Sequence, residues 1–200
     1  SAIDQGVKMP RCKVCKSKFE AKYFLQKACL NPACLAEWAR LDREQKADKA
    51  HKQKKKEFKL SDVGHQHNLT QPVFNRLRVA EEKLWFTSRG LEPECISCGK
   101  TNMDWCCGHF KTRGSQGGLR YDRKNTFLQC NRYCNMGLSG NISGNKNTRG
   151  YIQGLHDRFG EEANSIIEYC ETNTKPKKWT GEEIQEMRKE FSRQLKDLIQ

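Results

Sequence analysis

This sequence has no long hydrophobic run. No apolar segment approaches the roughly 20 residues that a membrane-spanning helix needs, and no signal peptide precedes the first cysteines. We therefore expect no membrane partner and a reducing compartment. Apolar residues are also scarce, since only 36% of the 200 residues are hydrophobic. A single large core is not expected, and small metal-stabilised modules joined by solvated helices fit this composition better.

Acidic residues are too few to balance the basic ones. The chain has 37 Lys and Arg against 24 Asp and Glu, a net charge of +13. Because a membrane is excluded, the sequence predicts a nucleic-acid partner. The imbalance is greatest over residues 111–149, which hold eight Lys or Arg and one acid, Asp122. The candidate DNA-binding residues here are Lys111, Arg113, Arg120, Arg123, Lys124 and Arg132.

Cysteine, in contrast, is abundant. Paired cysteines in a reducing compartment bind metal rather than each other. Eight of the eleven cysteines form two sets with zinc-ligand spacing: Cys12, Cys15, Cys29 and Cys34, then Cys95, Cys98, Cys130 and Cys134. Each set predicts one structural Zn²⁺ held by four thiolates. Cys106 and Cys107 are expected to be packed thiols.

The first cysteine set predicts an N-terminal zinc finger over residues 1–38. We expect Phe19, Tyr23, Phe24 and Leu25 to form an apolar cap over its metal. The composition leaves open whether the finger contacts DNA, contacts a protein or only adds stability.

Residues 39–71 are interpreted as a charged helix followed by a linker. The helix is predicted over residues 35–60, which contain no Gly or Pro. Because it buries little, it is either a solvated spacer or an arm that follows the DNA backbone. Residues 61–71 are interpreted as the linker, with His65 and His67 at the surface.

The rest of the chain predicts an α+β fold. A helix is expected over residues 72–89, strands and loops between Cys98 and Cys130, and helices from Tyr151 onward. We assign residues 72–150 to one zinc-stapled module and residues 151–200 to a helical region. The last helix has an apolar stripe that can pack on the module or pair with a second copy of the chain: Ile184, Met187, Phe191, Leu195 and Leu198.

One histidine, His109, lies between the cysteine pairs of the second set. Its surroundings are glycine, amides and bases rather than an apolar run. A neutral imidazole can accept a proton from a water molecule that attacks a phosphodiester. We hypothesise that zinc holds a small scaffold rigid while His109 catalyses, against the alternative that it is a satisfied loop histidine.

These motifs together resemble a known family. Cys95-Ile-Ser-Cys98, Gly108-His109, Asn125 and the junction Cys134-Asn135 resemble the zinc-stapled His-Asn-His endonucleases, whose core is the ββα-metal or His-Me finger. With the N-terminal four-cysteine finger, the Lys-rich helix, Trp105, Ser139-Gly-Asn141 and the helix start at Trp179, most of the chain is similar to the phage NinG family, the Rap recombination endonucleases.

The resemblance implies metal-dependent cleavage of branched DNA, such as Holliday junctions and D-loops, in the cytoplasm of a bacterial host cell. It implies catalytic roles for His109, Asn125 and Asn135, with Asn125 holding His109 in position across the loop. Asn135 would offer an oxygen to a catalytic Mg²⁺, or Mn²⁺, beside the zinc thiolate Cys134. Recombination proteins are possible partners.

This chain departs from the family pattern in two places. Cys106 occupies a position where relatives carry an acid, so the remaining Mg²⁺ ligands are Asp104, Cys106 or water. The second cysteine pair has three intervening residues instead of two, which could rotate Asn135.

Two hypotheses follow from different classes. The first is a Mg²⁺-dependent structure-specific endonuclease, and cutting two strands of a symmetric junction favours a homodimer. The alternative is a non-catalytic zinc-finger protein that binds nucleic acid through the same basic surface.

Overall fold

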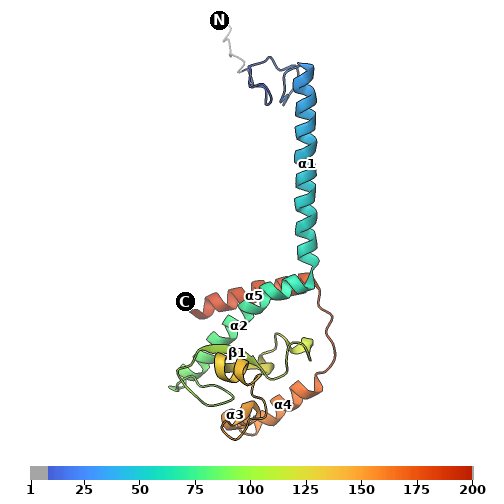
Figure 1. The fold of residues 1–200 in the computed structure, drawn as a ribbon. Coiled ribbons are helices and arrows are strands. Elements are labelled where there is room, and N and C mark those ends of the chain that lie inside the picture. The colour runs from blue at the N-terminus through green and yellow to red at the C-terminus, as the bar shows by residue number, and fades with distance from the viewer. Residues whose placement is uncertain (1–8, 200) are drawn as a thin grey trace. The chain divides into compact units, whose positions relative to one another are not determined.

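The computed structural model describes residues 9–199 of the chain, which divide between Phe58 and Lys59 into two compact units. The first unit contains the loops around Cys12 to Cys29 and most of helix α1 (Pro32–Ser61). The predicted charged helix is therefore confirmed (Figure 1). Its exposed surface carries short-range ion pairs such as Arg40 with Glu37 and Glu44.

The second unit is built on a two-stranded antiparallel sheet. Helix α2 (Val63–Thr87) precedes strand β1 (Trp105–His109), and short 3₁₀ turns, Gly117–Leu119 and Arg123–Asn125, lead into strand β2 (Thr126–Cys130). A π-helical turn, Asn131–Gly137, follows β2 directly. Helices α3 (Gly150–Phe159), α4 (Glu162–Thr172) and α5 (Gly181–Ile199) complete the unit. The predicted α+β class is confirmed.

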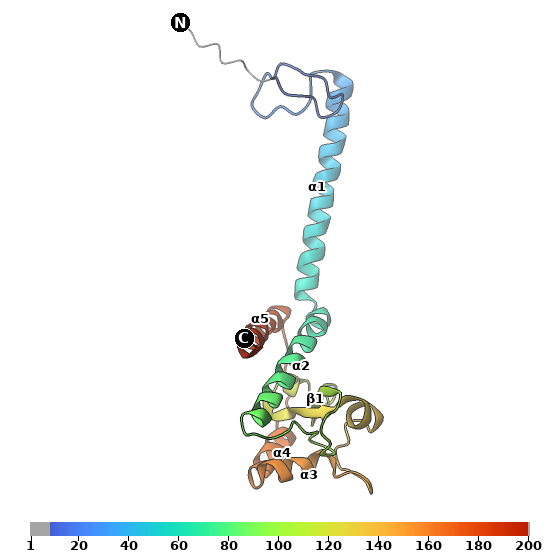
Figure 2. The same cartoon turned by 90° about the vertical axis from the view of Figure 1, so that its left-hand side faces the viewer.

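The sheet lies between α2 on one face and the α3–α4 pair on the other (Figures 1 and 2). Side chains alternate between the faces of a strand. Cys107, opposite Leu128 in the register, packs in a cluster with Phe74 and Leu77 of α2. Phe127, opposite Gly108, instead packs with Tyr151 and the residues of α3 and α4.

Helix α5 lies along α2 and buries its predicted stripe there (Figure 1). Ile184 and Phe191 are buried, and Met187, Leu195 and Leu198 pack partly buried around the α2 cluster. The capping box at its start forms, because Thr180 Oγ1 accepts from Glu183 N and Glu183 accepts from Thr180 N. Of the two alternatives for the stripe, packing on the module is the one observed.

The predicted linker over residues 61–71 is wrong, because α2 already begins at Val63. Asp62 caps the helix by accepting from His65 N at 3.0 Å. The polar residues that suggested a linker bind neighbouring elements: Gln66 Nε2 donates to Lys59 O, and Thr70 Oγ1 donates to Ile184 O. His67 is likewise not a free surface residue, since its Nδ1 lies 2.8 Å from the Tyr121 hydroxyl.

None of the helices within residues 9–199 combines the length and the apolar character needed to cross a membrane.

Candidate functional site

Both predicted cysteine sets come together in space. Within each set the four Sγ atoms all lie within 4.8 Å of one another, and none of the cysteines forms a disulfide. Four ligands at the Zn–S distance of 2.3 Å are separated by about 3.8 Å at the corners of a tetrahedron. The Cys15–Cys29 and Cys98–Cys130 sulfurs are 3.9 and 3.8 Å apart. The donor type and its spacing therefore fit zinc, and both clusters could hold it.

The first pair of each set forms the same tight turn. Lys16 N donates to Cys12 O at 2.9 Å, and Gly99 N donates to Cys95 O at 2.8 Å. The residue after each second cysteine is left-handed, with φ of 64° at Lys16 and 70° at Gly99. Backbone N–H groups also point at sulfur, as from Cys130 N to Cys95 Sγ at 3.3 Å. Such bonds favour the thiolate form that a metal needs.

The expected apolar cap over the first cluster is only partly correct. Phe19 packs against the buried cysteines, together with Val14 and Trp38. Tyr23, Phe24 and Leu25 are instead exposed and do not join the cluster of the buried cysteines.

His109 is the last residue of β1, and its strand is fixed from both sides. Gly108 packs so closely on Gln129 that an added Cβ would lie 2.5 Å from that side chain, so no larger residue fits here. The Gly108 carbonyl also accepts a hydrogen bond from the buried Tyr151 hydroxyl at 2.9 Å. The Gly108-His109 motif is therefore a strand end whose position is set by packing.

One ring nitrogen of His109 is engaged in a hydrogen bond to the backbone. Because a carbonyl only accepts, Nε2–H donates to Arg120 O at 3.1 Å, which leaves Nδ1 as the basic nitrogen. Burial lowers the pKa of His109, and the nearby Arg113 and Arg120 charges lower it further against opposing backbone hydrogen bonds. The lowered pKa favours the neutral ring, which is the form able to accept a proton.

Asn125 is completely buried and does not bind His109 directly. Its Oδ1 accepts from Lys111 N at 2.7 Å, and its Nδ2 donates to Lys111 O and Leu119 O. The predicted bond across the loop is present, but it holds the segment after Phe110. Asn125 therefore positions the loop and does not reach the cleft.

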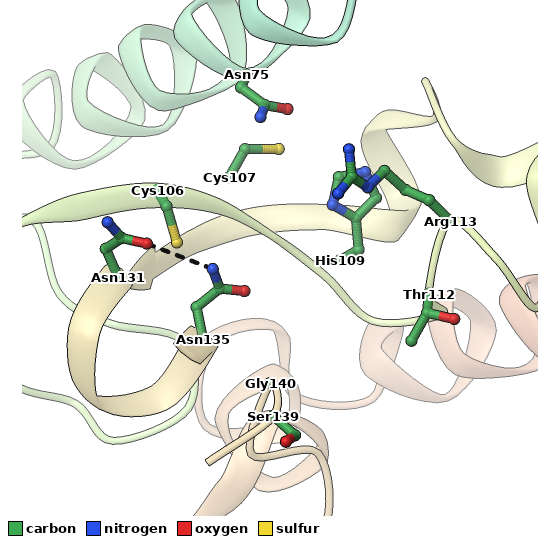
Figure 3. Close-up of a pocket in the computed structure, with 10 residues that line it drawn as sticks. All are labelled: Asn75, Cys106, Cys107, His109, Thr112, Arg113, Asn131, Asn135, Ser139 and Gly140. Atoms are coloured by element: carbon green, nitrogen blue, oxygen red, sulfur yellow. Dashed lines mark hydrogen bonds between the residues drawn. The ribbon is translucent and has the colours of Figure 1, made fainter. Parts of the chain in front are cut away.

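His109 and Asn135 line one polar cleft of about 380 Å³ (Figure 3). Asn135 lies on the π-helical turn, where its Nδ2 donates to Asn131 Oδ1 at 3.4 Å. This bond leaves the Asn135 carbonyl oxygen on the side of the cleft toward His109 (Figure 3). The remaining lining residues are Asn75, Cys106, Cys107, Thr112, Arg113, Asn131, Ser139 and Gly140.

Sequence reasoning missed two of these amides. Asn131 follows Cys130 of the second cysteine set and precedes Asn135 by four residues, a spacing that could have identified it. Asn75 comes from α2, and nothing in its local sequence distinguishes it from other polar helix residues.

The cleft is suited to a hard cation only together with a substrate. Asn75, Asn131 and Asn135 offer amide oxygens, and none of the described residues lining the cleft is a carboxylate. Asp104 is exposed and lies beside Asn131 and Arg132 instead. Cys106 is a poor ligand, because burial raises the pKa of its thiol to about 12 and its Sγ–H donates to Gln129 O. Mg²⁺ commonly takes substrate phosphates and water as its other ligands, so Asn135 fits such a site.

The six predicted DNA-binding residues differ in how free their charges are. Arg113 lines the cleft, and no ion pair is recorded for it within residues 9–199. Lys111 and Arg123 are paired with Glu171 and Glu81 at 3.3 and 2.6 Å. The others are Arg120 beside His109, Lys124 over the Tyr169 ring, and the exposed Arg132, 4.0 Å from Asp104.

Comparison with known proteins gives the family of this chain. A family model described as the bacteriophage lambda NinG protein matches residues 5–200. The chain belongs to the NinG family. Protein ninG of Escherichia phage 933W is 30% identical over 200 residues, which cover 94% of this chain and 92% of that protein.

Two other NinG proteins match a shorter region. Those of Escherichia phage lambda and Salmonella phage P22 are 35% identical over 105 residues, 52% of this chain and 47% of each relative. No solved structure matches the chain. The predicted NinG membership is therefore confirmed by sequence.

Proposed function

We propose that this NinG-family protein is a metal-dependent endonuclease that cleaves branched DNA. This is the activity implied by its resemblance to the Rap and His-Asn-His endonucleases. The observation that carries the proposal is the shared cleft of His109 and Asn135. A proton acceptor and a hard oxygen ligand face the same polar space, with the Arg113 charge at its edge.

In this mechanism the phosphodiester enters the cleft beside Arg113, which attracts the phosphate. His109 Nδ1 accepts a proton from the attacking water, a role worth roughly 10²–10⁴-fold in rate. The bond from Nε2 to Arg120 O places the proton on Nε2, so Nδ1 carries the lone pair. Asn125 keeps the loop after Phe110 closed, so the imidazole keeps its place relative to the strand.

Asn135 would hold a Mg²⁺ or Mn²⁺ ion that stabilises negative charge on the departing 3′ oxygen. Asn131 accepts from the Asn135 amide nitrogen, which would leave the amide oxygen available to the ion. The adjacent zinc thiolate Cys134 anchors the turn on which both amides lie.

Branched DNA is the proposed substrate because the resemblance points to recombination intermediates. A homodimer would bring two clefts to the two strands of a symmetric junction.

The test is parallel binding and cleavage of one labelled four-way junction. His109→Ala and Asn135→Ala should retain zinc and junction affinity, since neither side chain holds zinc or most of the positive charge. Cleavage should fall by about 10²-fold or more for His109→Ala. The defect of Asn135→Ala should ease partly at higher Mg²⁺. Cys95→Ser should lose both binding and cleavage.

His51→Ala is the matched control, since His51 is exposed on α1 and lies outside the cleft. Its cleavage should equal that of the wild type. Full cleavage by purified His109→Ala would refute the mechanism, and junction binding without cleavage by the wild type would favour the non-catalytic zinc-finger alternative.

A further inference from the structure

Three consecutive apolar side chains in the N-terminal unit are left mostly uncovered by the residues that the structure describes. Tyr23, Phe24 and Leu25 are 58, 90 and 66% exposed, and Phe24 is the most exposed of the large hydrophobic residues described. We call Tyr23–Leu25 the apolar tip. Contiguous exposed apolar patches on a protein surface often mark sites that bind another molecule.

The apolar tip is held in a fixed shape. Gln26 is buried beneath it, where its Oε1 accepts from Lys22 N at 2.8 Å and its Nε2 donates to Ala28 O at 2.7 Å. Gln26 N also donates to Tyr23 O, which closes the loop on itself. Leu25 adopts a left-handed φ of 63°, a conformation that costs energy for a residue with a side chain. The hydrogen bonds therefore stabilise a loop that displays its apolar residues.

The surroundings of the apolar tip are cationic. Residues 9–31 contain six Lys or Arg and one acid, Glu20. All six are exposed, and none forms an ion pair within the described part of the chain: Arg11, Lys13, Lys16, Lys18, Lys22 and Lys27. An apolar tip within a segment of uncompensated positive charge is complementary to a polyanion with apolar faces inside it. DNA has this composition, with phosphates outside and bases within.

We propose that the apolar tip is a wedge that inserts Phe24 between bases at the branch point of DNA, while the surrounding lysines contact the phosphates. The inference rests on the proposed function in taking branched DNA as the ligand. In a linear duplex every base face is covered by its neighbour, so insertion must first separate two stacked steps. At a branch point the stack is already interrupted, so Phe24 can cover a base face at lower cost. The N-terminal unit would therefore supply preference for branches.

The test compares binding of a four-way junction and a linear duplex of the same sequence, with full-length protein, fixed salt, no Mg²⁺ and no chelator. Phe24→Ala should weaken junction binding by about 5- to 150-fold, the range for loss of one aromatic–base stack. Duplex binding should change less than about 2-fold, because the lysines remain. Phe24→Trp should keep the preference for junctions. A 2-aminopurine at the branch should change fluorescence with the wild type but not with Phe24→Ala.

Leu91→Ala is the matched control, an exposed apolar residue in the other unit and away from the cleft lining. It should leave both affinities unchanged. Three results would overturn the wedge: no junction preference in the wild type, an unchanged preference in Phe24→Ala, or an equal loss on junction and duplex. An unchanged preference would assign the apolar tip to a protein partner. Zinc content measured on each variant separates these results from loss of the finger.

The two proposals fail separately. A protein that selects junctions through Phe24 but never cuts them refutes the nuclease and supports the wedge. The opposite result is a protein that cuts junctions, loses cutting in His109→Ala and keeps its junction preference in Phe24→Ala. That result supports the nuclease and refutes the wedge.

Discussion

Glu82 carries a buried charge on which the whole second unit depends. Its side chain is 6% exposed, and its Oε1 accepts from Arg78 Nη2 at 2.9 Å. Its Oε2 accepts from Arg158 Nη1 at 2.7 Å and from Leu128 N at 3.1 Å. One carboxylate therefore connects α2 to β2 and α3.

Arg158 is the partner that would suffer most from loss of Glu82. Its side chain is 4% exposed, and Glu82 is its one recorded ion-pair partner among residues 9–199. Aromatic rings surround its guanidinium, with the Trp85 ring centre at 4.0 Å and Phe86 at 4.5 Å. Arg78 is less dependent, because it also pairs with Glu81 and donates to Thr126.

Glu82→Gln should therefore destabilise the fold by about 3–5 kcal/mol, the cost of leaving a buried charge uncompensated. This is a large part of the roughly 5–15 kcal/mol that stabilises a typical domain. The measurement is urea unfolding followed by circular dichroism at a fixed excess of free zinc, because metal binding adds to apparent stability. Adding Arg158→Met should recover part of the loss, since it removes the unpaired charge and fills the same aromatic site.

The matched control is Glu186→Gln on α5. Glu186 pairs with Lys189 at 2.6 Å, but both side chains are mostly exposed. Its removal should cost less than about 1 kcal/mol. If Glu82→Gln changes stability no more than Glu186→Gln does, the buried network does not hold α2, β2 and α3 together as reasoned.

Three further predictions concern the site. Because the pKa of His109 is lowered, the cleavage rate should rise with pH through a midpoint below about 6.5 and then level off. Arg113→Ala should move this midpoint upward, because it removes a nearby positive charge. Single-turnover rates with a wild-type midpoint above about 7 would contradict this. Metal analysis should find two zinc ions per chain, each contributing roughly 10–16 kcal/mol to metal-linked folding, and fewer than one per chain would end the zinc assignment. The logarithm of the junction affinity should fall with the logarithm of the salt concentration by about 0.9 per neutralised phosphate. Arg113→Ala should reduce this slope more than Arg123→Ala, because Glu81 already compensates the charge of Arg123. Equal slopes for the two variants would count against the role of Arg113.

What the sequence could predict was local chemistry. Cysteine spacing is set by the geometry of a chelate, so Cys95 and Cys98 could be assigned without knowing the fold. His109 could be found because it lies between the two cysteine pairs of the second set, and Asn135 because it directly follows Cys134. Asn75 could not, since it reaches the cleft from α2 only through the packing of Phe74 and Leu77 on the sheet.

The predictions that failed depended on whether a residue meets a distant partner in the folded chain. Gln66 and Thr70 have the composition of a linker, but they lie in a helix because Lys59 and Ile184 supply hydrogen-bond partners. Tyr23 and Phe24 have the composition of a core, but no neighbour covers them among the described residues. A local pattern records the polarity of a residue and not which distant residue will meet it.

The extra residue between Cys130 and Cys134 shows how the zinc cluster and the cleft depend on one another. The chain here forms a π-helical turn, Asn131–Gly137, which is wider than an α-helical one and accommodates the additional residue. Cys134 N donates to Cys130 Sγ at 3.3 Å, so both ligands lie on the same side of the turn. Asn131 and Asn135 repeat the same four-residue step one position later, and their side chains bond to each other at the cleft. Because one turn carries both pairs, we expect a change that displaces Cys134 to displace the oxygen of Asn135 as well. A zinc ion bound by these cysteines would therefore act on the proposed chemistry through position, although none of the four cysteines lines the cleft.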